Sequence, residues 1–387
     1  MPDTTGQEAV ARLPKHIPEL DGVRGLAILL VLMYHYVAVP IPSQAGGSLR
    51  FLRQLMSNGW SGVDLFFVLS GFLIAGLLID HRDAANYFKV FYVRRITRIF
   101  PLYYSFLAIY LILAFAAPRL GWLSQSMFVN SLPMLPYFIY VQNFVMAANG
   151  TFGNEFLAIT WSLAIEEHFY LFLPWLVKRS RPARLILNLA FLLIMSLALR
   201  VLLGGGTFVG FVGTPWRLDA LLLGAILAIL FRSATTAALM RAHVRWLKLG
   251  TAALLIFFFY SSMTEPLGSL DHLLVFGLMY VGLIGMVLSD TTSLTSRFFR
   301  LPPMMTLGKI SYGVYLLHQL VNGIVHDLLF KHLPSFVSPA TMAATGLAVA
   351  LTILVAWVSF NAFERYFIDL GHSFHYAPES ARPTASA

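Results

Sequence analysis

Long apolar runs separated by short polar segments dominate the pattern of hydrophobic positions along this 387-residue chain. A helix needs about 20 apolar residues to cross a ~30 Å hydrocarbon core. One apolar run, near 134–147, is too short for this and prolines interrupt its start, so we expect an interfacial or re-entrant segment there. The pattern predicts an all-α, polytopic integral membrane protein with about ten transmembrane helices. The ten runs of spanning length lie near residues 22–40, 61–79, 99–117, 161–177, 184–203, 215–231, 247–263, 271–289, 307–330 and 340–363.

The positions of the basic residues predict the orientation. If the N-terminus is cytoplasmic and all ten runs span, 21 of the 27 lysines and arginines lie on the cytoplasmic side. Cytoplasmic loops carry such an excess, so we expect both termini in the cytoplasm. The first run lacks a cleavage site and is interpreted as a retained span. The polar ends predict disorder in residues 1–15 and 371–387, on either side of a transmembrane domain at 16–370.

Composition narrows the chemistry. Apolar residues make up 58% of the chain and charged residues 12%, with a mean hydropathy of +0.73. The net charge of +9 is explained by the basic loops, so we expect no nucleic-acid partner. The absence of cysteine excludes disulfides, thiolate metal sites and a cysteine nucleophile. The histidines form no metal-ligand spacing, so no metal is expected.

The first run contains two ionisable residues, Arg24 and His35, which are costly inside a membrane. Helix rise separates them by roughly 16 Å, so the arginine can lie at one face while the histidine lies deep inside. Neutral imidazole is a suitable general base at neutral pH. The alternative is a snorkelling arginine, paired with Asp21 or Glu19, and a histidine bonded to a neighbouring helix.

A second cluster, Arg94, Arg95 and Arg98, lies at the cytoplasmic start of the third run. Arg95 and Arg98 share a helix face, and two guanidinium groups on one face suit phosphate oxygens. No glycine-rich phosphate loop is present, so side chains would have to hold a phosphorylated ligand. The alternative is a basic flank that only sets the topology.

A third cluster, Glu166, Glu167 and His168, lies early in the fourth run. The two glutamates point about 100° apart, so at most one readily faces a given partner. Glu166 lies at a depth comparable to that of His35, and a carboxylate there could orient the imidazole; the alternative is a helix–helix contact. Other intramembrane polar residues carry weaker signals: Asp64 as a helix N-terminal charge or supporting partner, Asp219 as a partner of Arg217, and His318 in a packing and hydrogen-bonding role.

Taken together, the order and spacing of these motifs resemble membrane acyltransferase family three, also called the exopolysaccharide O-acyltransferase family. The resemblance extends over roughly residues 16–370. The segments that carry it are 20–25 with the histidine at 35, 62–72, 94–101, 161–166 and 311–318.

The resemblance implies a bacterial inner-membrane enzyme of about ten helices that moves an acyl group, most often acetyl, from cytoplasmic acyl-coenzyme A to a hydroxyl of a glycan or other acceptor. It implies His35 as the catalytic base, Arg24 as its paired arginine and Arg95 with Arg98 as the two-arginine motif. It also implies Glu166, or with less support Glu167, as the family glutamate. Some members carry a fused outer hydrolase-like domain. Here we expect transfer within the membrane domain or with a separate periplasmic partner.

These observations predict that Arg95 and Arg98, with Arg94 and Arg24, bind the coenzyme A phosphates, and that Glu166 orients His35. A relay through an acyl-histidine stays open. Ser70, Tyr312 and Trp161 are candidates for the oxyanion donor. The competing hypothesis is a proton-coupled transporter or flippase for a lipid-linked sugar, although no internal repeat or matched pair of broken helices is visible. The acceptor, the acyl chain length and the oligomeric state are not predicted.

Overall fold

A bundle of α-helices forms the protein in a computed structural model, which describes residues 14, 16–117, 119–204, 206–264 and 272–378. Among these residues there is no β-strand. Seven segments are long and apolar enough to cross a membrane. They are Pro18–Ala38, Gly47–Asp80, Tyr87–Ala116, Glu155–Arg179, Arg184–Gly204, Val244–Thr264 and Pro339–His372.

The long helices follow the predicted runs closely. They are α1 (Pro18–Met33, continued by the π-helical turn η1, Tyr34–Ala38), α3 (Gly62–Asp80), α4 (Tyr87–Ala116), α8 (Thr160–Arg179), α9 (Pro182–Leu199), α13 (Val244–Thr264) and α18 (Pro339–Ser359).

The predicted count of ten spans is not confirmed, because three of the predicted runs fall outside this set of seven. The helix α11 (Asp219–Arg232) has 14 residues and α14 (Leu273–Ser289) has 17. The helix α17 (Ser311–Phe330) has 20 residues, but buried polar side chains interrupt its apolar character. They include His318, Asn322, His326 and Asp327.

Shorter helices connect the long ones. The predicted interfacial run near 134–147 forms α5 (Leu135–Phe138) and α6 (Gln142–Asn149), each too short to span. The others are α2 (Gly47–Leu55), η2 (Ser57–Ser61), η3 (Gln125–Phe128), α7 (Glu155–Ala158), η4 (Arg200–Gly204), α10 (Phe208–Val212), η5 (Thr214–Trp216), α12 (Ala234–Ala242), α15 (Leu294–Phe299), α16 (Pro302–Lys309), η6 (Phe360–Glu364) and α19 (Arg365–His372).

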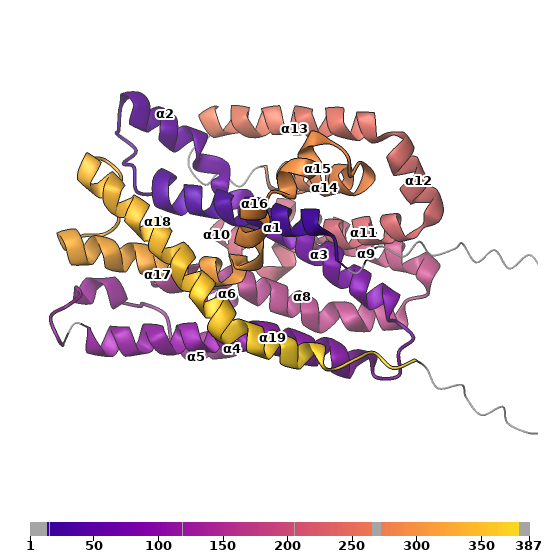
Figure 1. Cartoon of the computed structure of the whole chain (residues 1–387), viewed down its shortest axis with the longest axis horizontal. Helices are drawn as coiled ribbons and strands as arrows, with labels where there is room; N and C mark the ends of the chain where they lie inside the picture. The colour runs from indigo at the N-terminus through magenta and orange to yellow at the C-terminus, as the bar shows by residue number, and fades with distance from the viewer. Residues whose placement is uncertain (1–13, 15, 118, 205, 265–271, 379–387) are drawn as a thin grey trace, which may run out of the picture.

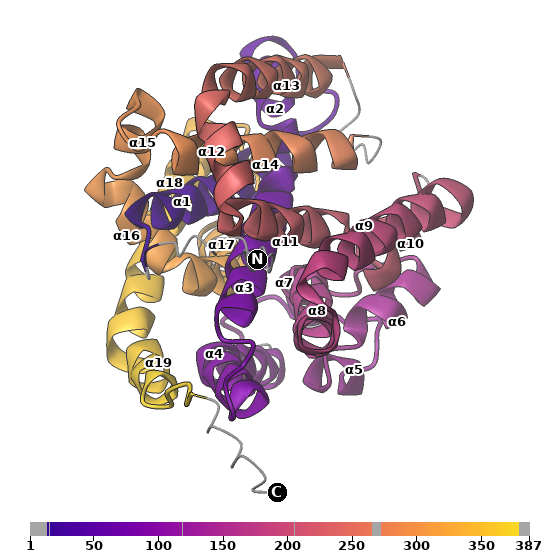
Figure 2. The same ribbon diagram turned by 90° about the vertical axis from the view of Figure 1, so that its right-hand side faces the viewer.

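Helix α3 lies at the centre of the bundle, with α1, α4, α8 and α11 around it (Figures 1 and 2). Its core-facing side chains include Leu65, Phe67, Val68 and Leu69, all at most 1% exposed. Helix α17 packs against α1 and α18, and α19 packs against α4. Segments that are far apart in the sequence therefore meet around α3.

Two glycines allow α1 to approach α16 closely. A Cβ added to Gly25 would lie 2.3 Å from the carbonyl oxygen of Met304, and one added to Gly308 would lie 1.8 Å from that of Asp21. Small residues at such contacts let membrane helices pack backbone to backbone. This packing fixes the turn of α1 that carries Asp21 and Arg24.

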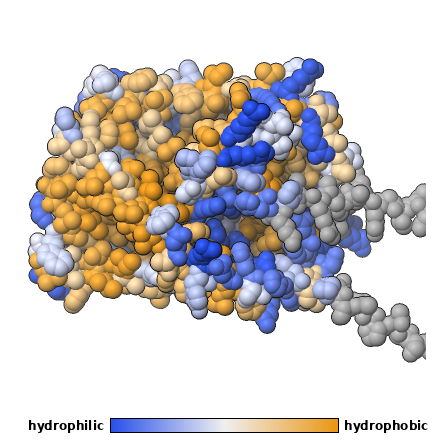
Figure 3. Space-filling view, viewed as in Figure 1, coloured by the Kyte–Doolittle hydropathy of each residue, from blue (hydrophilic) through white to orange (hydrophobic). Residues whose placement is uncertain are grey.

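The surface is divided between apolar and polar zones. In the view of Figure 3, hydrophobic side chains cover the half that includes α2, α17 and α18, whereas hydrophilic ones gather around α1 and α19. Exposed large apolar side chains also line α9, where Leu187, Phe191 and Ile194 are each more than 60% exposed. An apolar belt of this kind fits lipid contact.

Candidate active site

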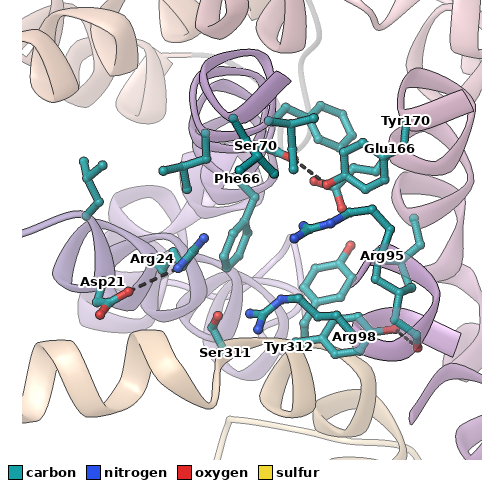
Figure 4. A pocket seen from close by; sticks show the side chains of 18 of the residues that line it. Asp21, Arg24, Phe66, Ser70, Arg95, Arg98, Glu166, Tyr170, Ser311 and Tyr312 are labelled. Carbon is teal, nitrogen blue, oxygen red and sulfur yellow. Dashed lines mark hydrogen bonds and ion pairs between the residues drawn. The ribbon is translucent and has the colours of Figure 1, made fainter. Parts of the chain in front are cut away.

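A cavity of about 440 Å³ opens between α1, α3, α4, α8 and α17 (Figure 4). We call it the arginine cavity. Phe66, Phe67 and Leu73 of α3 form part of its apolar wall. Its polar lining comes from segments spread over most of the chain: His16, Asp21, Arg24, Ser70, Arg95, Arg98, Ser162, Glu166, Glu167, Tyr170, Ser311, Tyr312, Tyr315 and His372.

The three arginines of this cavity differ in their partners. Arg24 donates to Asp21 over 3.1 Å. Arg95 and Arg98 have no hydrogen-bond or ion-pair partner within the part of the chain that the structure describes, and the Nε of Arg95 is buried. Figure 4 shows their guanidinium groups pointing into the same space. Two unpaired guanidinium groups that face one space repel each other, so the cavity suits a ligand with several anionic oxygens.

Both predicted glutamates line the arginine cavity, although the helical geometry favoured only one facing a given partner. Figure 4 places Glu166 beside Tyr170, which lies one helical turn further along α8. The hydroxyls of Tyr170 and Ser70 are 2.5 Å apart. Sequence reasoning missed Tyr170, although its i, i+4 spacing from Glu166 places both on one helix face.

His35 lies in the π-helical turn η1 and has a different partner from the one predicted. Its Nδ1 lies 3.0 Å from the carbonyl oxygen of Val31 and 3.2 Å from Nε2 of His318. No hydrogen bond joins it to Glu166 in the described part of the chain, because Glu166 faces the arginine cavity instead. The predicted orientation of His35 by Glu166 is therefore wrong for this structure. A π-helical turn within a helix is frequently found at functional sites.

Tyr315 joins the histidine pair to the arginine cavity. Its side chain lines the cavity, and its ring centroid lies 5.9 Å from that of His318. His318 and His35 themselves do not line the cavity; their ring centroids are 4.9 Å apart. The sequence placed His318 in a packing and hydrogen-bonding role, and it does form hydrogen bonds, but with His35 as one partner.

Asp64 lies outside the cavity, in a separate group of buried charges. It accepts from Arg217 over 2.7 Å, and both side chains are at most 1% exposed. Asp219 accepts from Arg200 over 2.9 Å, so the predicted Asp219–Arg217 pair is wrong. The partners are exchanged because Arg217 points toward α3, which carries Asp64. The ring centroids of Phe67, Trp161 and Phe211 lie 5.5–5.8 Å from its guanidinium carbon. We call Asp64, Arg200, Arg217 and Asp219 the closed cluster.

Arg94 also lies outside the cavity lining, because the C-terminal segment engages it. Its Nη2 and Nε donate to the carbonyl oxygen of Phe374 over 2.7 and 3.1 Å, and its guanidinium lies over the ring of Tyr376. Two of its N–H groups are thus bound to the C-terminal segment and its side chain does not line the cavity, so its role in ligand binding stays a prediction.

Residues 373–377 form a strap, where the composition predicted disorder. Asn86 donates to His375 and accepts from the backbone of Ala377, each over 2.9 Å. The rings of His81 and Tyr376 stack at 4.0 Å, and burial raises the pKa of Tyr376. The predicted disorder of 371–387 is thus wrong for residues up to 378, and the remainder lies outside the described residues. Of the predicted N-terminal tail, Pro14 is described and lines the arginine cavity.

The candidate oxyanion donors are also separated by the fold. Ser70 and Tyr312 line the arginine cavity, whereas Trp161 packs around Arg217. The hydroxyl of Tyr312 already donates to the carbonyl oxygen of Ile99 over 2.9 Å. Trp161 therefore packs against the closed cluster in this structure.

Comparison with known proteins agrees with the predicted family. The chain is 29% identical over 377 residues to an O-acetyltransferase OatA of Staphylococcus aureus (strain NCTC 8325 / PS 47), covering 91% of this chain and 57% of that protein. It is 27% identical over 373 residues to a peptidoglycan O-acetyltransferase OatA of Listeria monocytogenes, covering 90% and 55%. The chain thus spans little more than half the length of these relatives. No solved structure is significantly similar to it.

The family model described as an acyltransferase domain matches residues 17–360. This range includes the lining of the arginine cavity except for Pro14, His16 and His372, and it includes the His35–His318 pair. The chain belongs to this acyltransferase family.

Proposed function

We propose that this protein is an O-acyltransferase that moves an acetyl group from cytoplasmic acyl-coenzyme A to a hydroxyl of a glycan. The observation that carries this proposal is the pair Arg95 and Arg98, whose guanidinium groups have no partner among the described residues, in a cavity whose lining residue Tyr315 contacts the His35–His318 pair. The family membership and the names of the relatives support acyl transfer over the competing transport hypothesis.

The donor enters with its phosphates at the arginines. Arg95 and Arg98 each offer several N–H groups in a planar fork, which matches phosphate oxygens. Arg24 adds a third cation on the opposite wall, oriented by Asp21. The flexible pantetheine arm of coenzyme A then extends past Tyr315 toward the histidines. This arrangement requires the cavity to open toward the cytoplasm, which is the side that the distribution of basic residues predicts for both termini.

The reaction needs a base, and His35 supplies it. His35 takes the proton of the acceptor hydroxyl, the hydroxyl oxygen bonds to the acyl carbon, and the carbon–sulfur bond breaks. The proton then passes from His35 to the thiolate, so the products are an O-acyl ester and free coenzyme A. General acid–base catalysis of this kind contributes typically about 10²–10⁴-fold.

The acceptor is proposed as a cell-wall glycan presented from the outer side of the membrane. The support is the name of the Listeria relative, which specifies peptidoglycan. Transfer takes place within the membrane domain or is completed by a separate periplasmic partner.

Release of coenzyme A from acetyl-coenzyme A tests the proposal. Purified protein in lipid nanodiscs is supplied with peptidoglycan fragments, and wild type is compared with His35→Ala. A matched control is His243→Ala, an exposed histidine of the α12–α13 connection. We expect release by wild type and His243→Ala and loss in His35→Ala. No release from any acyl donor, with glycan acceptors present, would contradict acyl transfer and favour proton-coupled transport.

A further inference from the structure

The hydrogen bonds around His35 assign a role to its neighbour on α17. Resting on the proposed function, we propose that His318 is the positioning residue of the reaction: it holds the His35 ring with Nδ1 protonated and Nε2 free to take the acceptor proton. The sequence offered Glu166 for this task, but Glu166 lies on the wall of the arginine cavity.

The argument starts at the carbonyl oxygen of Tyr315, which only accepts hydrogen bonds. Nδ1 of His318 lies 2.6 Å from it and must therefore carry the hydrogen. A neutral imidazole has one N–H, so Nε2 of His318 is left as an acceptor. This Nε2 faces Nδ1 of His35 at 3.2 Å.

The same reasoning fixes the second ring. Nδ1 of His35 also lies 3.0 Å from the carbonyl oxygen of Val31, and that contact again requires a hydrogen on Nδ1. The hydrogen is shared between Val31 and His318. The only nitrogen of His35 left without a hydrogen is Nε2, which is the atom that a general base needs. The tautomer of a histidine base is set by the bond that its other nitrogen makes.

The protein holds both rings in place. Tyr36, one residue after His35, donates to the backbone carbonyl of His318 over 2.9 Å, and its hydroxyl lies 2.7 Å from Thr352 of α18. His318 is fully buried, whereas His35 is partly exposed. The histidine that stays partly exposed, His35, is thus the one expected to meet the acceptor.

His318 has a second effect once the proton has moved. When Nε2 of His35 takes the hydroxyl proton, the ring becomes an imidazolium and its Nδ1–H becomes a charge-assisted donor to His318. Such bonds are roughly twice as strong as neutral ones, so the interaction strengthens as the charge forms. A carboxylate has this role in Ser–His–Asp triads. In this protein the neutral imidazole of His318 has that role, because a carboxylate buried there would add a charge to the membrane interior.

Two amide variants test the proposal. In His318→Gln the amide reaches the position of Nε2, so its oxygen accepts from His35. In His318→Asn the amide reaches only the position of Nδ1, so it retains the bond to Tyr315 but loses His35. We expect His318→Asn to lower kcat by about 10-fold or more, but by no more than the ~10²–10⁴-fold that general-base catalysis contributes in full, with the KM for acetyl-coenzyme A unchanged. His318→Gln should retain kcat to within about threefold, because the acceptor of the His35 hydrogen is preserved.

The matched control is His326→Asn, the same change at another fully buried histidine of α17. It should leave kcat unchanged. Equal losses in His318→Asn and His326→Asn, or equal losses in His318→Asn and His318→Gln, would mean that helix packing alone is disturbed and would overturn the positioning role. Full activity of His318→Asn beside an inactive His35→Ala would overturn it as well. Absence of coenzyme A release by wild type would instead overturn the proposed function.

Discussion

Two groups of charged side chains in the described part of the bundle are built in opposite ways. In the closed cluster each arginine has its own carboxylate, and aromatic rings cover the Arg217 guanidinium. In the arginine cavity Arg24 has a carboxylate partner, whereas Arg95 and Arg98 have none among the described residues and line open volume. The same residue types thus occur once as paired and covered charges and once as unpaired and accessible ones.

The difference shows which charges are available to a ligand. A buried ion pair that loses one partner leaves an uncompensated charge, so both members are needed for the fold. An unpaired cation in a cavity adds nothing to the fold and is stabilised only when an anion arrives. A carboxylate partner and a covering of aromatic side chains therefore distinguish the structural arginines from the ligand-binding ones. Residue type and depth in the bundle do not.

The largest expected effect comes from breaking the closed cluster. Arg217→Leu should lower the free energy of unfolding by about 3–5 kcal/mol, because Asp64 is left buried without its partner. The measurement is thermal unfolding of the purified protein in detergent. Arg241→Leu, at an exposed position of α12, is the matched control and should leave Tm nearly unchanged. Adding Asp64→Leu to Arg217→Leu should restore much of the loss; a double variant as unstable as the single one would contradict the pairing argument.

The next effect concerns donor affinity in the arginine cavity. Arg95→Ala/Arg98→Ala should weaken coenzyme A binding by about 100-fold, since a hydrogen bond to a charged group contributes about 1.5–3 kcal/mol. Tm should stay close to that of wild type, because neither side chain has a partner among the described residues. Isothermal titration with coenzyme A and with its dephosphorylated analogue measures the change.

Lys89→Ala is the control for this pair, because Lys89 is an exposed cation on the same helix. Its affinity for coenzyme A should match that of wild type. If the Arg95→Ala/Arg98→Ala variant binds coenzyme A as wild type does, or if its Tm falls as that of Arg217→Leu does, Arg95 and Arg98 would belong with the structural charges.

The smallest effect belongs to an ion pair outside both groups. Hydrogen bonds from Lys248 and Thr292 lower the pKa of Asp290 below its usual value of 3.8. A lowered pKa in the folded state stabilises the fold above the unfolded-state pKa, and this contribution is lost as the pH falls through the folded-state pKa. Wild type should therefore have a slightly higher Tm than Asp290→Asn at pH 6, and the difference should shrink as the pH falls below 3.8. A difference that is constant with pH would contradict this assignment.

The sequence predicted the helices better than their number of crossings. Runs of apolar residues located α1, α3, α4, α8, α9, α13 and α18, because membrane helices are defined by length and hydropathy. The sequence pattern did not distinguish α11 and α17 from these seven spanning helices. Both are largely enclosed by neighbouring helices, so their outer faces are not required to be apolar over a full span.

Within the site, local spacing was informative and long-range pairing was not. The i, i+3 arrangement placed Arg95 and Arg98 on one face, and both line the cavity. The partner of His35 lies 283 residues away on α17, and no local pattern specifies such a contact. Arg94 looked equivalent to its neighbours because the strap that engages it was predicted as a disordered tail.

The positions of His16 and His372 have a consequence for folding. His16 precedes α1 and His372 ends α19, yet both side chains line the arginine cavity. The cavity is therefore complete only once the first and the last helices are both in place. Its full lining cannot assemble on the emerging chain before α19 has packed against α4.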